Sequence, residues 1–202
     1  MRRTSLPWRA AARAVLAAAL VLALGGAALA APARQPTWRS LHRPLHIPHI
    51  APGEPCPTSK PDPRGDLGRF AGFGGTAWGR GPAYPAGLGD DKPVLVYVYP
   101  PIPTSAFAGS KWSGQKVNWI VAPSYRGRIL IRGRQLDGRN ELRFNDGLVP
   151  PREMHLIGRG PHTSTPSYTR VRAEGCYGYQ LDGKRFSRVV VFEARAVTPP
   201  PP

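Results

Sequence analysis

The aspartates, glutamates and histidines are the residues of this chain that catalysis would most need. Two of the aspartates stand in Asp137-Gly138 and Asp182-Gly183, where turns favour aspartate for backbone reasons alone. The glutamates are scattered, and no pair has the spacing that general acid–base catalysis needs. His155 and His162 lie close to Ser164, which leaves a Ser–His hydrolase as an alternative, although the chain has no G-x-S-x-G sequence. We therefore expect a protein without a catalytic site.

Three more histidines, His42, His46 and His49, lie within eight residues and raise the question of a metal site. No acidic residue or cysteine stands among them to complete a ligand set. The glycine-rich sequence GFGGTA, residues 72–77, lacks the preceding strand and following helix of a nucleotide-binding loop. We therefore expect neither a metal nor a cofactor.

Arginines alternate with isoleucines in residues 128–135, which is the pattern of a β-strand with one apolar face. Ile129 and Ile131 would face the core, so the arginines would line the outer face. Arg170 and Arg172 share one face of another predicted strand. If the two strands are neighbours, their arginines form a basic facet for phosphate or carboxylate polymers, whereas the alternative is an ordinary solvated sheet face. The candidate polyanion-binding residues are Arg128, Arg132, Arg134, Arg170 and Arg172.

The net charge bears on the choice of partner. It is +16 for the whole chain, and +12 remains when the four arginines of residues 1–30 are removed. A positive net charge of this size favours a polyanion as the binding partner. Outside the cytoplasm an anionic envelope polymer is a more natural partner than nucleic acid. The 25 prolines and 23 glycines offer a second explanation, because a GC-rich genome also produces a composition rich in Arg, Pro and Gly. The charge therefore permits polyanion binding without requiring it.

A second functional hypothesis concerns the predicted loop FAGSKWSGQ, residues 107–115, in which Trp112 stands among small and flexible residues. This composition is common in protein-recognition and inhibitor loops, with the tryptophan as an anchor. The alternative is that Trp112 packs onto its own domain. The two functional hypotheses differ in salt dependence, because polymer binding through arginines weakens as salt rises, whereas a contact anchored by tryptophan persists.

Residues 1–30 have the pattern of an export signal. Four arginines accompany an apolar run at residues 15–24, and Ala28-Leu29-Ala30 matches the small-x-small sequence after which a signal peptidase cuts. The alternative is an uncleaved anchor, since the 20 uncharged residues between Arg13 and Arg34 are just long enough to span a bilayer. Both interpretations place the domain outside the cytoplasm, either secreted or associated with the cell envelope.

The chain has two cysteines, Cys56 and Cys176, and an even number in an oxidising compartment favours one disulfide. The bond would close a loop of about 120 residues, which chain-entropy arguments value at roughly 5 kcal/mol. It would join the start of the domain to the strand before the last. A catalytic thiol is the alternative, but nothing near either cysteine suggests a partner histidine.

The predicted elements are those of an all-β protein with an N-terminal arm. Residues 31–54 form a Pro- and Arg-rich arm or linker, whose apolar residues favour docking on the domain. Residues 55–196 form the β domain, in which Gly, Asp and Pro interrupt the chain every 8 to 12 residues. The predicted strands are 94–99, 116–121, 128–135, 142–144, 167–172, 176–181 and 185–192, with a loop at 148–165, a turn at Asp182-Gly183 and a disordered proline tail at 197–202.

The last part of the chain resembles known β domains. The sequence GCYGYQLDG, residues 175–183, running into FSRVVVF, residues 186–192, resembles the last two strands of bacterial immunoglobulin-like domains. Together with RGRQLDG, it also resembles a family of uncharacterised bacterial exported proteins with no assigned activity. The resemblance implies an immunoglobulin-like antiparallel β-sandwich and no particular reaction. The chain departs from antibody domains because Trp119 follows Cys56 by 63 residues.

Overall fold

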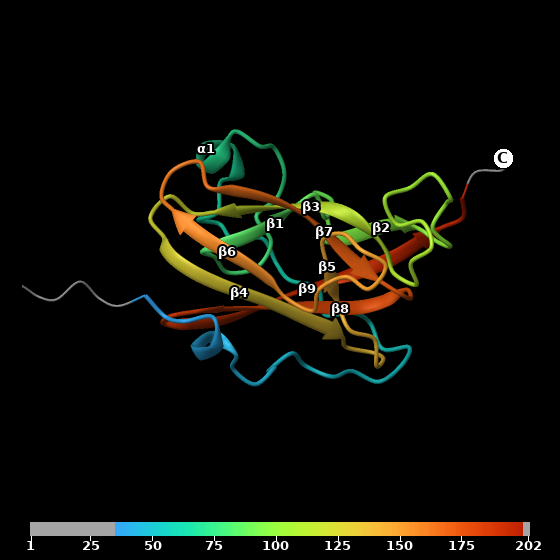
Figure 1. Cartoon of the computed structure of the whole chain (residues 1–202). Coiled ribbons are helices and arrows are strands. Elements are labelled where there is room, and N and C mark those ends of the chain that lie inside the picture. The colour runs from blue at the N-terminus through green and yellow to red at the C-terminus, as the bar shows by residue number, and fades with distance from the viewer. Residues whose placement is uncertain (1–34, 200–202) are drawn as a thin grey trace, which may run out of the picture. The chain divides into compact units, whose positions relative to one another are not determined.

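The computed structural model describes residues 35–199, and within them nine strands form two sheets (Figure 1). The four-stranded sheet has the order β1-β3-β7-β5, with β1 at Ala83–Ala86, β3 at Ser113–Val121, β7 at Ser164–Val171 and β5 at Arg143–Phe144. The five-stranded sheet has the order β2-β9-β8-β4-β6, with β2 at Val94–Val98, β9 at Phe186–Val197, β8 at Gly175–Gly183, β4 at Arg126–Gln135 and β6 at Met154–Arg159. A 3-10 helix, η1, spans Arg39–Leu41, and a short α-helix, α1, spans Leu67–Ala71.

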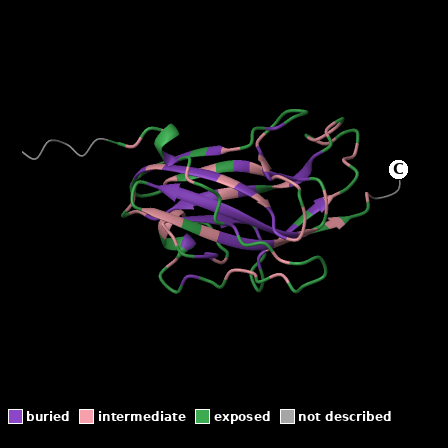
Figure 2. Cartoon of the chain, turned by 90° about the horizontal axis from the view of Figure 1, so that it is seen from below, coloured by how far each residue is buried: buried purple, intermediate pink, exposed green. Residues whose placement is uncertain are grey.

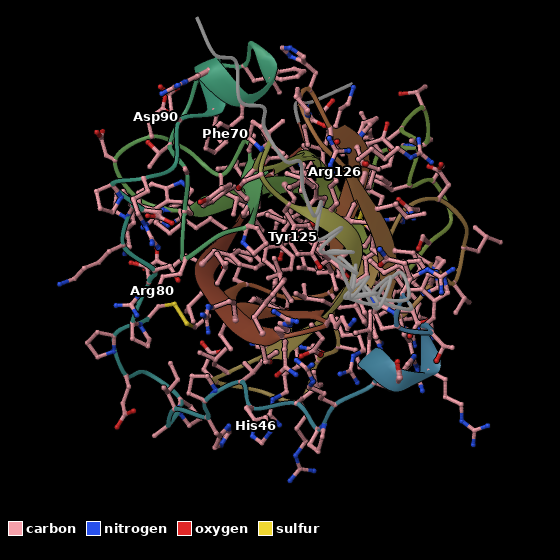
Figure 3. All side chains as sticks on the ribbon, turned by 90° about the vertical axis from the view of Figure 1, so that its left-hand side faces the viewer. His46, Phe70, Arg80, Asp90, Tyr125 and Arg126 are labelled. Atoms are coloured by element: carbon pink, nitrogen blue, oxygen red, sulfur yellow. A yellow bond between two sulfur atoms is a disulfide. The ribbon has the colours of Figure 1, made fainter. Side chains whose placement is uncertain are left out.

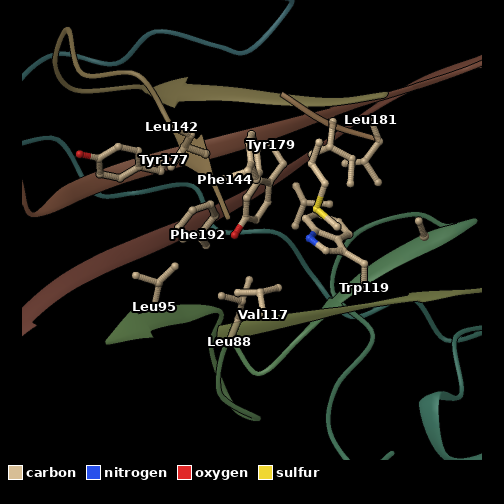
Figure 4. Packing of buried hydrophobic residues seen from close by; sticks show 14 of the residues in the cluster. Leu88, Leu95, Val117, Trp119, Leu142, Phe144, Tyr177, Tyr179, Leu181 and Phe192 are labelled. Atoms are coloured by element: carbon tan, nitrogen blue, oxygen red, sulfur yellow. The ribbon is translucent and has the colours of Figure 1, made fainter. Parts of the chain in front are cut away.

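One hydrophobic core lies between the two sheets. Trp119 of β3 meets Tyr179 of β8 with ring centroids 5.0 Å apart, and Tyr179 stacks on Phe192 of β9 at 4.5 Å (Figure 4). All three side chains are fully buried. Buried residues concentrate in the strands, while the connecting loops are mostly exposed (Figure 2). The predicted all-β fold class is therefore confirmed at the level of two facing, mostly antiparallel sheets.

The three strands from β7 to β9 form as predicted, but the last turn lies two residues further along the chain. β8 and β9 remain paired until Gly183 stands opposite Phe186, so the turn is at residues 184–185. The predicted turn at Asp182-Gly183 is therefore wrong. The Asp182 carboxylate is buried and bound by neighbouring side chains, which holds it in the strand. Gly183 leaves room for the Phe186 ring, which a Cβ at this position would approach to 2.2 Å.

Two strands and one pairing differ from the prediction. The predicted loop at residues 148–165 contains β6, in which Met154 and Leu156 are buried while the residues after each are exposed. β1 lies in the Gly- and Pro-rich region before Pro93, where no strand was predicted. β2 pairs with β9 in parallel, whereas the other strand pairings are antiparallel.

The N-terminal arm, defined here as residues 35–54, lies along the outer face of the five-stranded sheet (Figure 1). Its buried side chains are Leu41 and Ile47, and Ile47 packs in a cluster with Val191 of β9. Phe192, the next residue of β9, faces the opposite way into the main core. The arm therefore explains why β9 is apolar on both faces.

Cys56 and Cys176 form the predicted disulfide, 120 residues apart in sequence (yellow in Figure 3). The bond joins the residue just after the arm to β8. Directly afterwards, Ser59 and Val191 exchange two hydrogen bonds, from Ser59 N to Val191 O and from Val191 N to Ser59 Oγ, both at 2.9 Å. The segment after the arm is therefore fixed to both β8 and β9.

The predicted export signal, residues 1–30, lies outside the described residues, as do residues 200–202 of the predicted tail. β9 extends to Val197, which pairs with Val98, so the strand includes the first residue assigned to that tail. Across residues 35–199, no helix has both the length and the apolar character needed to cross a membrane.

Candidate functional site

The three arginines predicted on the outer face of β4 do lie on that face, but they are not open to solvent. Their guanidinium groups hold the arm. Each donates a hydrogen bond to a main-chain oxygen of the arm: Arg128 Nη1 to Pro36 O at 2.9 Å, Arg132 Nη2 to Arg43 O, and Arg134 Nη2 to Ile47 O at 2.7 Å. The expectation of a bare basic face is corrected, because the arm occupies it.

A buried carboxylate organises the middle of this contact. Asp182 of β8 is fully buried, and its Oδ2 accepts a hydrogen bond from Arg132 Nη2 at 2.9 Å. Gln180 Nε2 donates to the same carboxylate and also to Pro44 O at 2.9 Å, while Gln180 Oε1 accepts from His46 N at 2.7 Å. Asp182 and Gln180 therefore connect β4 and the arm to β8 in one hydrogen-bonded network.

The start of the arm is held by rings and by a shared carboxylate. Trp38 stacks on His155 of β6 with ring centroids 4.0 Å apart, and the Arg128 guanidinium lies 5.1 Å from the Trp38 ring. Glu153 lies between two histidines, with His42 Nε2 at 3.0 Å and His155 Nε2 at 2.9 Å. The arm is thus bound to β6 as well as to β4 and β8.

Beside the arm, a cleft of about 750 Å³ opens against β4 and the loop between β4 and β5. The arm contributes His42, Leu45 and His49 to its wall. Its basic residues are Arg132, Arg134, Arg139 and Arg152, and its acidic residues are Glu141 and Glu153. We call this space the arm cleft. It brings two of the predicted polyanion-binding residues together with two arginines that were not predicted.

The carboxylates of the arm cleft are already paired. Glu141 binds Arg143 Nη2 at 2.7 Å and Arg152 Nη2 at 3.3 Å. Glu153 is shared by the two histidines named above. Arg134 and Arg139, by contrast, have no carboxylate partner within residues 35–199. The arm cleft therefore offers uncompensated positive charge, which suits a carboxylate or phosphate group.

Arg170 of the second predicted pair lies in β7, in the other sheet, because β7 pairs with β3 and β5 and not with β4, and Arg172 lies just beyond the end of β7. Arg170 is fully buried, its guanidinium lies 4.1 Å from the Phe107 ring, and its terminal nitrogens donate to Trp112 O and to Asn145 O. Burial lowers the pKa of Arg170 from its ordinary value. The five predicted arginines therefore do not form one facet.

Trp112, the predicted protein-binding anchor, is 8% exposed and packs onto its own domain. Two guanidinium groups lie near its ring, that of Arg143 at 5.1 Å and that of Arg172 at 4.9 Å from the centroid. The expectation of an exposed aromatic anchor is corrected, because the Trp112 side chain is buried. Trp112 therefore packs the predicted loop, residues 107–115, onto the domain.

The residues considered for catalysis and metal binding are dispersed. His155 binds Glu153, and no hydrogen bond joins His155 or His162 to a serine in the described part of the chain. The three histidines of the arm do not converge either. Within residues 35–199, no group of three or more His, Cys, Asp or Glu side chains is placed to hold a metal ion.

The comparisons with family models, with curated proteins and with solved structures find no match for this chain. The resemblance to exported immunoglobulin-like proteins therefore stays a prediction.

Sequence reasoning missed several residues of the arm cleft for a common reason. Arg139 and Arg152 lie in loops, the first after Asp137-Gly138 and the second after two prolines, where no periodicity marks a functional face. The only sequence signal was the accumulation of arginine beside turn residues.

Proposed function

We propose that this chain is an exported, non-catalytic β-sandwich module of the immunoglobulin-like kind that binds anionic polymers of the cell envelope in the arm cleft. The observation that carries the proposal is the pair Arg134 and Arg139, which face this cleft without a carboxylate partner in the described chain while both glutamates of the cleft are paired. Export is supported by the disulfide and by the pattern of residues 1–30.

The chemistry of the cleft suits an acidic sugar or a similar repeating unit. A guanidinium binds a carboxylate through two parallel hydrogen bonds, which gives orientation as well as charge. Leu45 adds apolar surface beside these charges, and His42 and His49 add further polar groups. The net charge of +12 from residue 31 onward would raise the local concentration of any polyanion.

Protein recognition through Trp112 is the weaker candidate, because that ring is buried and already in contact with the guanidinium groups of Arg143 and Arg172. An anion in the arm cleft needs no such rearrangement of a packed side chain.

The test is binding of the chain from residue 31 onward to polygalacturonate, a carboxylate polymer, over a series of salt concentrations. Arg139→Gln should weaken binding about tenfold at low salt, since one charged hydrogen-bonding group is worth about 1.5 kcal/mol. Arg139 is exposed, so the folded state should be unaffected.

The matched control is Arg185→Gln, which removes the same charge from the exposed β8–β9 turn, outside the cleft. It should leave binding nearly unchanged. Equal weakening by both variants, or binding that does not respond to salt, would refute the arm cleft as the polymer site.

A further inference from the structure

A second basic cavity, of about 660 Å³, lies away from the arm cleft. It is formed by the segment after the disulfide, residues 59–64, by Gly79 and Arg80, and by the start of β9 at residues 187–189. Arg80 lies at the left of the view in Figure 3. The basic residues that line this cavity are Lys60, Arg64, Arg80 and Arg188, and we call it the β9 cavity.

The β9 cavity and the arm cleft flank the arm. Arg132 of the arm cleft pairs across the sheet with Gln180, and Gln180 pairs with Val189 of the β9 cavity. Gln180 binds the arm through Pro44 and His46, so the arm passes between the two spaces. They are separate sites that can be altered independently.

The single carboxylate of the β9 cavity, that of Asp62, is fully engaged. Its Oδ1 accepts from Arg64 N at 3.0 Å, and its Oδ2 accepts from Gly81 N at 3.2 Å and from the Tyr84 hydroxyl at 3.0 Å. Burial alone would raise the pKa of Asp62, but these hydrogen bonds outweigh it and hold the pKa below its ordinary value. Arg64 Nε also lies 3.4 Å from Asp62 Oδ1, so Asp62 compensates Arg64 and leaves Lys60, Arg80 and Arg188 without a carboxylate partner among residues 35–199.

The other basic residues of this cavity have few partners. No acidic side chain pairs with Lys60 or Arg80 among residues 35–199, and Arg188 has only a hydrogen bond to its neighbour, from Nη1 to Ser187 O at 3.2 Å. The hydroxyls of Ser59 and Ser187 lie among them. Most of the hydrogen-bond donors of the cavity are thus available to a ligand.

The backbone around these side chains is held in place before any ligand arrives. Gly79 N donates to Lys60 O at 3.0 Å, and Asp62 N donates to Ala77 O at 2.8 Å. Gly79 adopts a φ of 90°, and a Cβ there would come within 2.6 Å of Val190 Cγ2. The glycine therefore lets this segment lie directly against β9, which fixes the spacing of the basic residues that surround the cavity.

We propose that the β9 cavity is a phosphate-binding site. Lys60, Arg80 and Arg188 line one space that has no free carboxylate, which matches the multiple charge and the several acceptor oxygens of a phosphate better than a single carboxylate. The phosphate belongs either to an ester of an envelope polymer or to a free phosphate. The site is independent of the arm cleft and of its polymer.

The test is calorimetric titration of the chain from residue 31 onward with pyrophosphate at low salt. The double variant Arg80→Gln with Arg188→Gln should weaken pyrophosphate binding about a hundredfold, because each charged group contributes about 1.5 kcal/mol. In the unaltered protein, the amide NMR signals of Gly79, Gly81 and Ser187 should shift during the titration. A second double variant, Arg39→Gln with Arg185→Gln, removes the same charge from exposed positions outside the cavity and should bind pyrophosphate almost normally.

Three further measurements separate the possible results. Arg139→Gln should leave pyrophosphate binding unchanged while it weakens polygalacturonate binding, so the two proposals fail or stand separately. Dimethyl phosphate that binds as well as pyrophosphate would support a polymer phosphodiester as the source, and preference for pyrophosphate would support a free phosphate. Absence of pyrophosphate binding at low salt, or equal losses in the two double variants, would overturn the phosphate site.

Discussion

The arginines of β4 and Arg170 of β7 stand in the same alternating sequence pattern but do different work. On β4, Arg128, Arg132 and Arg134 reach outward and bind main-chain oxygens of the arm, about 90 residues earlier in the chain. On β7, Arg170 lies buried beneath a loop, over the ring of Phe107. Alternation therefore identifies the face on which an arginine lies, but it does not reveal whether that face is covered.

The arm explains why arginine in particular is used on β4. Its closely spaced prolines lack N–H groups and prevent it from pairing as a regular strand, so its carbonyl oxygens need other donors. An arginine carries five N–H donors on a long side chain and can reach such oxygens at irregular spacing. On β7 the same side chain instead joins two loops, through Trp112 O and Asn145 O.

The largest loss of stability is expected where an arginine of β4 neutralises a buried charge. Arg132→Gln should lower the free energy of unfolding by about 3 kcal/mol, because it leaves Asp182 buried with only the distant Arg43, at 3.8 Å, as a charged partner. Urea denaturation would measure the loss. Adding Asp182→Asn removes the stranded charge, so the double variant should recover most of the lost stability, and failure to recover would show that the charge pair is not the cause.

At the end of β7 the corresponding contrast lies between Arg170, within the strand, and Arg172, just beyond it. Arg170→Gln should cost about 2 kcal/mol, because one buried and one partly buried carbonyl oxygen lose a charged donor. Arg172→Gln should cost less than about 1 kcal/mol, because it loses only an exposed contact with the Trp112 ring. Equal losses in urea denaturation would mean that burial does not distinguish the two arginines.

The sequence was informative wherever a local pattern decides the structure. Alternation around Ile129 and Ile131 located β4, and the run that ends at Phe192 located β9. Cys56 and Cys176 were paired correctly, since no other cysteine was available. The strands could be predicted because their pattern lies within a few consecutive residues. The disulfide could be predicted because two cysteines allow only one pairing.

The features that the sequence did not predict depend on contacts between segments that are distant in the chain. Asp182-Gly183 has the composition of a turn, yet the Asp182 carboxylate is bound by Arg132 from another strand and stays in β8. The position of the arm on the sheet depends on Gln180 and on the β4 arginines, and a proline-rich segment has no periodicity from which to predict it. The arm cleft and the β9 cavity form only after those contacts are made.

The smallest loss of stability is expected at Arg128, which contacts the start of the arm. Arg128, Arg132 and Arg134 together are called the β4 row here. Arg128→Gln should lower the free energy of unfolding by about 1 kcal/mol, because it loses one hydrogen bond to Pro36 O and a ring contact with Trp38. Hydrogen exchange should quicken at residues 40–43, whose amides donate to main-chain oxygens of residues 37–41. The hydrogen bonds from His46 N to Gln180 Oε1 and from Ile50 N to Leu136 O do not involve Arg128, so exchange at His46 and Ile50 should stay slow. Faster exchange throughout the arm would instead mean that Arg128 and Arg132 act as one cooperative unit, and the β4 row would then hold the arm collectively rather than contact by contact.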